Sequence, residues 1–155
     1  MVVRFRLPAD TRRKIEKIQD FPVTIPYAVK RGLDLALSVV RGRIQAQRLS
    51  GRGPFPPSEH RLGIVTQQLQ RSLREEPAVI TGDGTVITAS IGSPVFYGAL
   101  HEYGWTGTVV RGQGRPYQMR IPERAPVRTG VSENASYIAG EVVDQVDKAF
   151  QEAAR

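Results

Sequence analysis

The segment AVITGDGTVITASI, residues 78–91, decides the fold of this chain. It contains two runs rich in Val, Ile and Thr, and these residue types favour β-strands. The runs flank Gly82-Asp83-Gly84, where an Asp-Gly pair supplies the positive φ angles that tight hairpin turns need. The segment therefore predicts a β-hairpin, and with it an antiparallel sheet.

Long helices are predicted on both sides of this hairpin. Upstream, Thr24 is suited to cap a helix that runs to about Arg48, with Pro26 in its first turn. Apolar residues recur in it three and four positions apart, which is the spacing of one buried stripe: Val29, Leu33, Ala36, Leu37, Val40 and Ile44. Downstream, Ser132 or Asn134 precedes a helix over residues 135–154, whose apolar residues are four apart: Ile138, Val142, Val146 and Phe150.

Shorter elements lie between and before these helices. A strand is predicted at residues 2–7, followed by a short charged helix that Asp10 or Thr11 caps. Another short helix is predicted at residues 67–73, with Thr66 as its cap. Pro94 begins a helix that stops at Gly104, and the alternation in residues 105–121 indicates a second hairpin.

This order of elements predicts an α+β fold, in which an antiparallel twisted sheet is flanked by a long N-terminal helix and a C-terminal helix. The length of 155 residues predicts a single domain over residues 1–155. Gly and Pro are concentrated in two segments, so we expect flexible loops at residues 49–61 and 105–115.

Composition restricts the class of protein. The chain has no cysteine, which excludes disulfides and thiolate metal sites and fits an intracellular protein. No h-region of a signal peptide and no apolar run of about 18 residues occurs, so secretion and membrane association are not expected.

Charge is distributed unevenly around a net value of +7. Residues 1–74 hold 15 Lys and Arg against 5 Asp and Glu, whereas residues 75–155 hold 7 against 10. Such polarity suits nucleic acid, identical subunits that pack a basic face on an acidic one, or partners in a larger assembly. The cations expected at an interface or a channel are Arg4, Arg6, Arg12, Arg13, Lys30, Arg31, Arg41, Arg43 and Arg128.

The pair His101-Glu102 is the one arrangement that resembles a catalytic site. Adjacent residues on a helix point about 100° apart, however, so neither side chain can orient the other. His101 is therefore expected to pack or to form hydrogen bonds near the end of its helix. His60 and His101 are the only histidines, so a zinc site would need carboxylates to complete it, and the chain has neither a His-x-x-x-His motif nor a Cys pair. We expect no catalytic, cofactor-binding or metal-ligating residue, and no enzyme activity.

Several short motifs occur in an order that resembles the tail-completion, or virion-morphogenesis, family of tailed phages. The order is Leu-Ser-Gly at residues 49–51, Thr-x-x-Leu-x-x-Ser-Leu at 66–73, Tyr-Gly-x-x-His-Glu-Tyr-Gly at 97–104 and Ile-Pro-x-Arg at 121–124. The resemblance covers residues 28–154. The motif residues expected to pack in the fold are Tyr97, His101, Glu102, Tyr103, Gly104, Ile121, Pro122 and Arg124.

The resemblance implies a structural protein of the virion neck that completes the tail at the head–tail junction after assembly in the host cytoplasm. Its subunits would form a homo-oligomeric, hexameric ring between the head connector and the tail tube, with an architecture similar to tail terminators. DNA would pass through the ring and contact it non-specifically. Expected partners are other copies of the chain, the head connector or stopper protein, and the tail tube or tail terminator protein.

Other readings of the sequence stay open at this point. The chain could be a tail terminator proper, which caps the tube of major tail protein. A basic protein that binds DNA without sequence specificity would use the first half of the chain on phosphates. A small enzyme using His101 and Glu102 is the third alternative.

Overall fold

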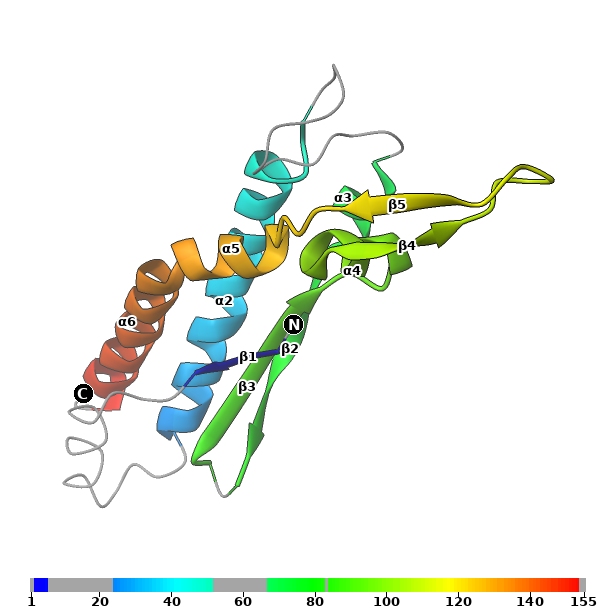
Figure 1. Cartoon of the computed structure of the whole chain (residues 1–155). Helices are drawn as coiled ribbons and strands as arrows, with labels where there is room; N and C mark the ends of the chain where they lie inside the picture. Colours follow the sequence, from blue (N-terminus) through cyan, green and yellow to red (C-terminus); the bar gives the residue numbers. More distant parts are fainter. Residues whose placement is uncertain (1, 6–23, 52–66, 83, 154–155) are drawn as a thin grey trace. The chain divides into compact units, whose positions relative to one another are not determined.

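The computed structural model describes residues 2–5, 24–51, 67–82 and 84–153 (Figure 1). The chain forms two compact units. One consists of residues 1–41, 74–92 and 133–155, and the other of residues 42–73 and 93–132. The single domain over residues 1–155 stays a prediction. The predicted α+β class is confirmed, because long helices accompany antiparallel strands.

The first unit contains the two long helices, α2 (Thr24–Gln47), whose residues up to Arg41 belong to this unit, and α6 (Ala135–Ala153). The buried stripe of α2 is confirmed, because its predicted residues are at most 1% exposed. In α6, Ile138, Val142 and Val146 are at most 5% exposed, whereas Phe150 is only partly buried. The helices approach closely at Gly32, where an added Cβ would lie 2.7 Å from the Cα of Val142. A side chain at residue 32 would therefore push α2 and α6 apart.

The sheet of this unit has three strands in the order β1–β3–β2, all antiparallel. They are β1 (Val2–Phe5), β2 (Arg74–Thr81) and β3 (Val86–Gly92). The predicted hairpin is confirmed, with positive φ angles of 60° at Gly82 and 85° at Gly84. Ile87, Ala89 and Ile91 alternate along β3 and are buried, so one face of the sheet contributes to the core.

Strand β2 begins at Arg74, four residues before the predicted start. Its register shifts between Glu76 and Val79, a β-bulge at Pro77 and Ala78. Proline has no N–H, so a bulge lets it stand inside a strand. The N–H of Ala78 donates a 2.6 Å hydrogen bond to the Asp34 carboxylate instead of joining the ladder. A side chain of helix α2 thus supplies the hydrogen-bond acceptor for the N–H group in the bulge.

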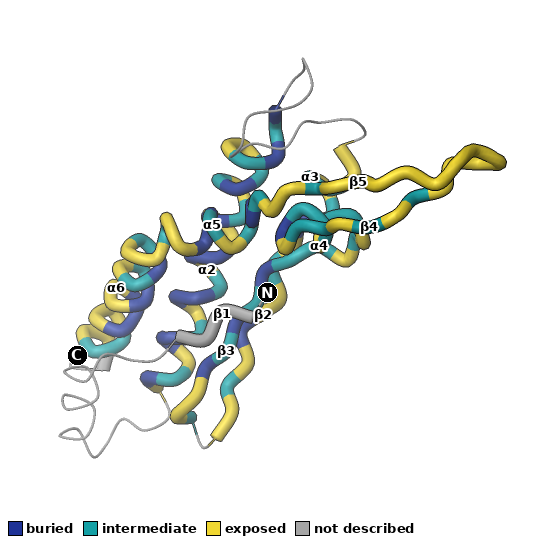
Figure 2. The backbone as a smooth tube through the Cα atoms, in the orientation of Figure 1, coloured by how far each residue is buried: buried dark blue, intermediate teal, exposed yellow. Residues whose placement is uncertain are grey.

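The described residues of the second unit include three short helices and a two-stranded sheet. The helices are α3 (Gln68–Ser72), α4 (Phe96–Tyr103) and α5 (Pro126–Glu133). Strands β4 (Trp105–Val109) and β5 (Tyr117–Ile121) pair antiparallel, which confirms the second hairpin. Residues 105–109 of the expected loop 105–115 therefore form a strand. Figure 2 shows the far part of this hairpin as exposed, and every residue from 110 to 120 is exposed.

Helix α5 was not predicted from the sequence, which placed Arg128 before the last helix without assigning it to an element. Ser132, one of the two proposed caps of that helix, lies inside α5. The other cap, Asn134, is correct, because its carbonyl accepts a 2.9 Å hydrogen bond from the N–H of Ile138. Pro126 at the first position of α5 is a helix-start signal that the sequence did contain.

Some predictions fall outside the described residues. They are the charged helix after Asp10, the cap Thr66 and most of the loop 49–61, together with Arg6, Arg12 and Arg13. Arg4 lies in β1, opposite Thr88 of β3.

Candidate functional site

The two motif segments, residues 97–104 and 121–128, come together in the second unit. Gly104 ends α4 with a φ of 72°, and β4 begins at the next residue. β4 then pairs with β5, with Trp105 opposite Ile121. The backbone at Gly104 lies so close to the backbone of Glu123 that a Cβ on residue 104 would be 3.0 Å from the Glu123 nitrogen. Glycine is required at residue 104 for its φ and for this approach.

The end of α4 holds the turn that leads into α5. The carbonyl oxygen of His101 accepts hydrogen bonds from the N–H groups of Arg124, at 2.9 Å, and Ala125, at 3.2 Å. Ala125 has a φ of 43°, in the left-handed region that residues other than glycine rarely adopt. The carbonyl of Ala125 accepts the first helical hydrogen bond, from the N–H of Thr129 at 2.9 Å. Ala125 is therefore the N-cap of α5.

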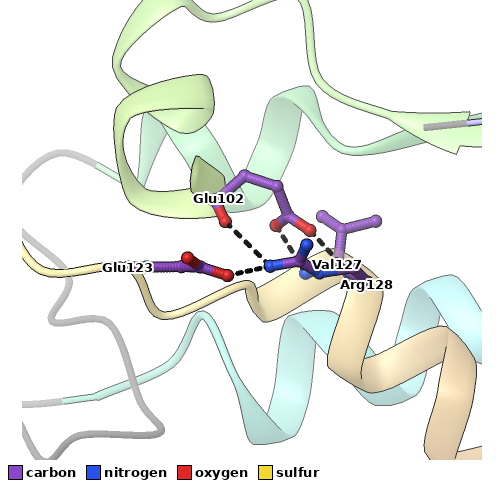
Figure 3. A network of polar contacts seen from close by, with 4 residues as sticks. All are labelled: Glu102, Glu123, Val127 and Arg128. Carbon is purple, nitrogen blue, oxygen red and sulfur yellow. Dashed lines mark hydrogen bonds and ion pairs between the residues drawn. The ribbon is translucent and has the colours of Figure 1, made fainter. Parts of the chain in front are cut away.

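An alanine N-cap has no side chain with which to satisfy the first N–H groups of its helix, and Glu102 of α4 does this instead (Figure 3). Its Oε2 accepts a hydrogen bond from the N–H of Val127 at 3.0 Å, and its Oε1 accepts one from Arg128 at 2.8 Å. Pro126, between Ala125 and Val127, has no N–H. Every N–H group of the first turn of α5 thus has a partner in α4.

Glu102 is only 7% exposed and is the buried residue of α4. A buried carboxylate is costly unless it is compensated. Here the two charge-assisted hydrogen bonds and the positive end of the α5 dipole compensate it. We call this arrangement of His101 and Glu102 of α4 with residues 123–128 the α4–α5 junction.

Arg128 adds a second link at the surface of the α4–α5 junction. Its Nη2 lies 3.5 Å from the carbonyl oxygen of Glu102 and forms an ion pair with the Glu123 carboxylate (Figure 3). Both charged side chains are about half exposed, at 49% and 55%, so solvent screens the pair. The sequence singled out Arg128 as an interface or channel residue; in this unit it holds Glu123.

His101 is in an unusual electrostatic environment. Burial and the neighbouring positive charge of Arg124 together lower the pKa of His101 below its ordinary value. Its Nδ1 and the Nε of Arg124 are buried and have no hydrogen-bond partner among the described residues. His101 is therefore neutral at pH 7. Glu102 cannot orient it as a base, because both carboxylate oxygens are bonded to α5.

The structure places the remaining predicted residues in several environments. Tyr103 and Pro122 are exposed, whereas Tyr97 and Ile121 are partly buried. On α2, Lys30 pairs with Asp34 at 2.7 Å and Arg41 pairs with Glu75 at 2.9 Å. Arg31 is exposed and Arg43 is partly buried. The predicted cations of the first half are thus not gathered into one free patch among the described residues.

Sequence reasoning missed Ala125 and Val127 at the α4–α5 junction, and the exposed residues Tyr117 and Met119 of β5. The signals that could have found them are Pro126, which marks a helix start, and the alternation of polar and apolar residues after Tyr117.

Neither a metal centre nor a membrane-spanning helix is found in the part of the chain that the structure describes. No three His, Asp or Glu side chains there could hold an ion together, and no helix there is both long and apolar enough to cross a bilayer. Comparison with protein-family models, with curated proteins and with solved structures finds no match to this chain.

Proposed function

We propose that this chain is a structural protein of the neck of a tailed phage, which completes the tail at the head–tail junction as a ring through which DNA passes. The observation that carries this proposal is the α4–α5 junction. The motifs 97–104 and 121–124, on which the resemblance to tail-completion proteins rests, meet there: the carbonyl oxygen of His101 accepts a hydrogen bond from the N–H of Arg124. Glu102 of the first motif also caps α5, the helix that follows the second motif. Motifs that meet to form one turn of the fold are expected to mark a shared architecture, and not a catalytic site.

The chemistry of the junction favours a structural role over an enzymatic one. A general base needs a free carboxylate or an imidazole that a second group orients. The oxygens of Glu102 both accept hydrogen bonds from backbone N–H groups, and burial together with the nearby charge of Arg124 lowers the pKa of His101. The carboxylate of Glu102 and the carbonyl oxygen of His101 both accept hydrogen bonds from backbone N–H groups of residues 124–128. This supports the view that the two residues maintain the fold.

The ion pairs of cations on α2 and α5 support the proposal of a ring in which DNA can slide. Each phosphate that a protein neutralises steepens the salt dependence of DNA binding by about 0.9 in log units, so many such contacts would trap DNA. Lys30, Arg41 and Arg128 each pair with a carboxylate of their own unit. These pairs reduce the number of cations free to hold phosphates.

The proposal is tested by removing the gene for this chain from the phage or prophage that encodes it and imaging the products by electron microscopy. A neck protein predicts DNA-filled heads and separate tails of normal length that fail to join. A tail terminator proper predicts tails of uncontrolled length. Complete, infectious particles would contradict both structural roles.

Binding to free duplex DNA tests the remaining alternative. We expect the purified chain to show little affinity for duplex DNA when light scattering and DNA binding are measured at low and high salt. Tight, salt-sensitive binding by a stable monomer would instead support a basic DNA-binding protein.

A further inference from the structure

The hairpin β4–β5 has an apolar face that is partly uncovered. Cross-strand partners share a face of a sheet, and the register places Trp105, Gly107 and Val109 opposite Ile121, Met119 and Tyr117. Tyr117 is 46% exposed and Met119 is 39% exposed. The opposite face is polar, with Thr106, Thr108, Gln118 and Arg120. An isolated two-stranded hairpin is marginally stable in water, so packing of this apolar face against another surface would stabilise it.

The same hairpin is purely basic. Residues 105–122 contain Arg111, Arg115 and Arg120 and no Asp or Glu. All three arginines are exposed, and no carboxylate of the described residues forms an ion pair with them. A partner of the hairpin should therefore combine apolar surface with negative charge.

Helix α6 presents such a surface. Val143 is 47% exposed on it, next to the small residue Gly140 one turn earlier. Asp147 lies beside Val143 on this face and Asp144 at its edge, about 40° and 100° around the helix, whereas Glu152 lies on the opposite side of α6. No cation of the described residues forms an ion pair with these three carboxylates. Residues 133–152 contain five acidic residues and one Lys, so the helix is strongly acidic overall.

We propose that the hairpin β4–β5 of one copy docks on the exposed face of α6 of the next copy. Tyr117 and Met119 cover Val143 and Gly140, while Arg111 and Arg115, from the turn of the hairpin, lie near Asp144 and Asp147. The two surfaces are different patches of one chain, so the contact is heterologous. Repeated from copy to copy, a heterologous contact generates a ring when the rotation closes and an open filament when it does not, whereas a contact between identical patches stops at a dimer. This inference rests on the proposed ring and names the surfaces that build it.

Complementarity favours a second copy over DNA as the occupant. Duplex DNA would use the arginines but would leave the apolar face of Tyr117 and Met119 uncovered. It would also leave the acidic, partly apolar face of α6 without a role. A second copy covers both faces with one contact.

Cysteine cross-linking tests the contact directly, since the chain has no cysteine of its own. A Met119→Cys chain is mixed with a Val143→Cys chain and oxidised with copper phenanthroline. We expect a covalent dimer in the mixture and none from either variant alone. Thr108→Cys, on the polar face of the hairpin, is the matched control and should not cross-link to residue 143. Cross-linking of Met119→Cys to itself would overturn the proposal in favour of paired hairpins.

Charge reversal gives an independent test. Arg111→Glu with Arg115→Glu makes one chain in which hairpin and helix are both acidic. Asp144→Arg with Asp147→Arg makes another in which both are basic. Each chain alone should lose self-association by more than tenfold, and mixing the two should restore it, because each hairpin again meets an opposite charge. Circular dichroism and the unfolding midpoint check that both variants fold.

Two outcomes of this experiment would overturn the inference. One is self-association that neither pair of substitutions changes. The other is self-association that persists in the Arg111→Glu, Arg115→Glu chain while binding to duplex DNA is lost, which would assign the hairpin to DNA. If the unmodified chain stays monomeric in isolation, the cysteine pair is introduced into phage particles, and absence of the 119–143 cross-link there overturns the inference.

The particle experiment also separates this inference from the proposed function. A chain located in the neck without a 119–143 cross-link leaves the function standing and refutes the contact. A cross-linked ring of the purified chain that is absent from the neck does the reverse.

Discussion

The buried carboxylate of Glu102 accepts a 2.8 Å hydrogen bond from the backbone N–H of Arg128, 26 residues further along the chain. Glu102 belongs to α4 and Arg128 to the first turn of α5, so a side chain of one helix caps another. This relationship explains why a charged residue is buried in a short helix, and it joins the two motifs in one structural element.

Substituting Glu102 by Gln should destabilise the fold. The variant is nearly isosteric but turns an NH₂ donor toward one of the two backbone N–H donors and removes the charge at the helix N-terminus. We expect a loss of about 2 kcal/mol in the free energy of unfolding. Glu123→Gln, at the exposed end of the same junction, is the matched control and should lose less than about 0.5 kcal/mol. Denaturant titration measures both, and equal effects would contradict the capping role.

Stability should fall below pH 6.5 through His101. Its folded-state pKa is lowered from the ordinary value of 6.5 by burial and by Arg124. Protons therefore bind the unfolded chain more readily. The stabilisation is complete above pH 6.5 and is lost as the pH falls from there toward the folded-state pKa.

His101→Gln removes the titrating group, so the difference in the free energy of unfolding between pH 7.5 and pH 5.5, about one unit to either side of the ordinary histidine pKa, should shrink relative to the unmodified chain. The same pH dependence in both proteins would assign the effect to other groups.

Two glycines of the long helices should respond in opposite directions to alanine. Gly32→Ala places a Cβ 2.7 Å from the Cα of Val142, and we expect it to cost about 2 kcal/mol through separation of α2 and α6. Gly140→Ala meets no atom within 4 Å in an exposed part of α6 and should stabilise by about 0.5–1 kcal/mol through helix propensity. Thermal and denaturant unfolding compare the two variants, and stabilisation by Gly32→Ala would refute the close approach.

Asp34 should be required for the bulge in β2. Asp34→Ala leaves the buried N–H of Ala78 without its acceptor, which we expect to cost about 2 kcal/mol. Lys30→Met removes the other partner of Asp34, in a pair whose side chains are 31% and 35% exposed, and should cost about 0.5 kcal/mol or less. If the lysine variant proved the more damaging in denaturant titration, the ion pair and not the bulge would be what Asp34 serves.

Elements with a regular period could be predicted from the sequence. The stripe from Val29 to Ile44 and the stripe of α6 follow from helical spacing, because burial of one helix face imposes that spacing. The hairpin around Gly82 and Gly84 follows from local turn chemistry, since positive φ angles restrict the residue type. Each of these signals lies within the element that it predicts.

The α4–α5 junction could not be predicted in the same way. The partner of Val127 and Arg128 is Glu102, and the partner of the Ala78 N–H is Asp34, 44 residues away. Such hydrogen bonds depend on tertiary structure, and a charged residue such as Glu102 carries no local sign that it will be buried. For the same reason α5 was missed: its N-cap is an alanine, and its cap is supplied from another helix.

The central claim, that this chain is a neck protein at the head–tail junction, is tested most directly by locating it in the intact virion. Cryo-electron microscopy of particles, with the neck resolved well enough to trace side chains, is the measurement. The account predicts a ring of density between the connector and the tail tube into which residues 24–51, 67–82 and 84–153 fit, including the α4–α5 junction. A neck fully accounted for by other chains would contradict it.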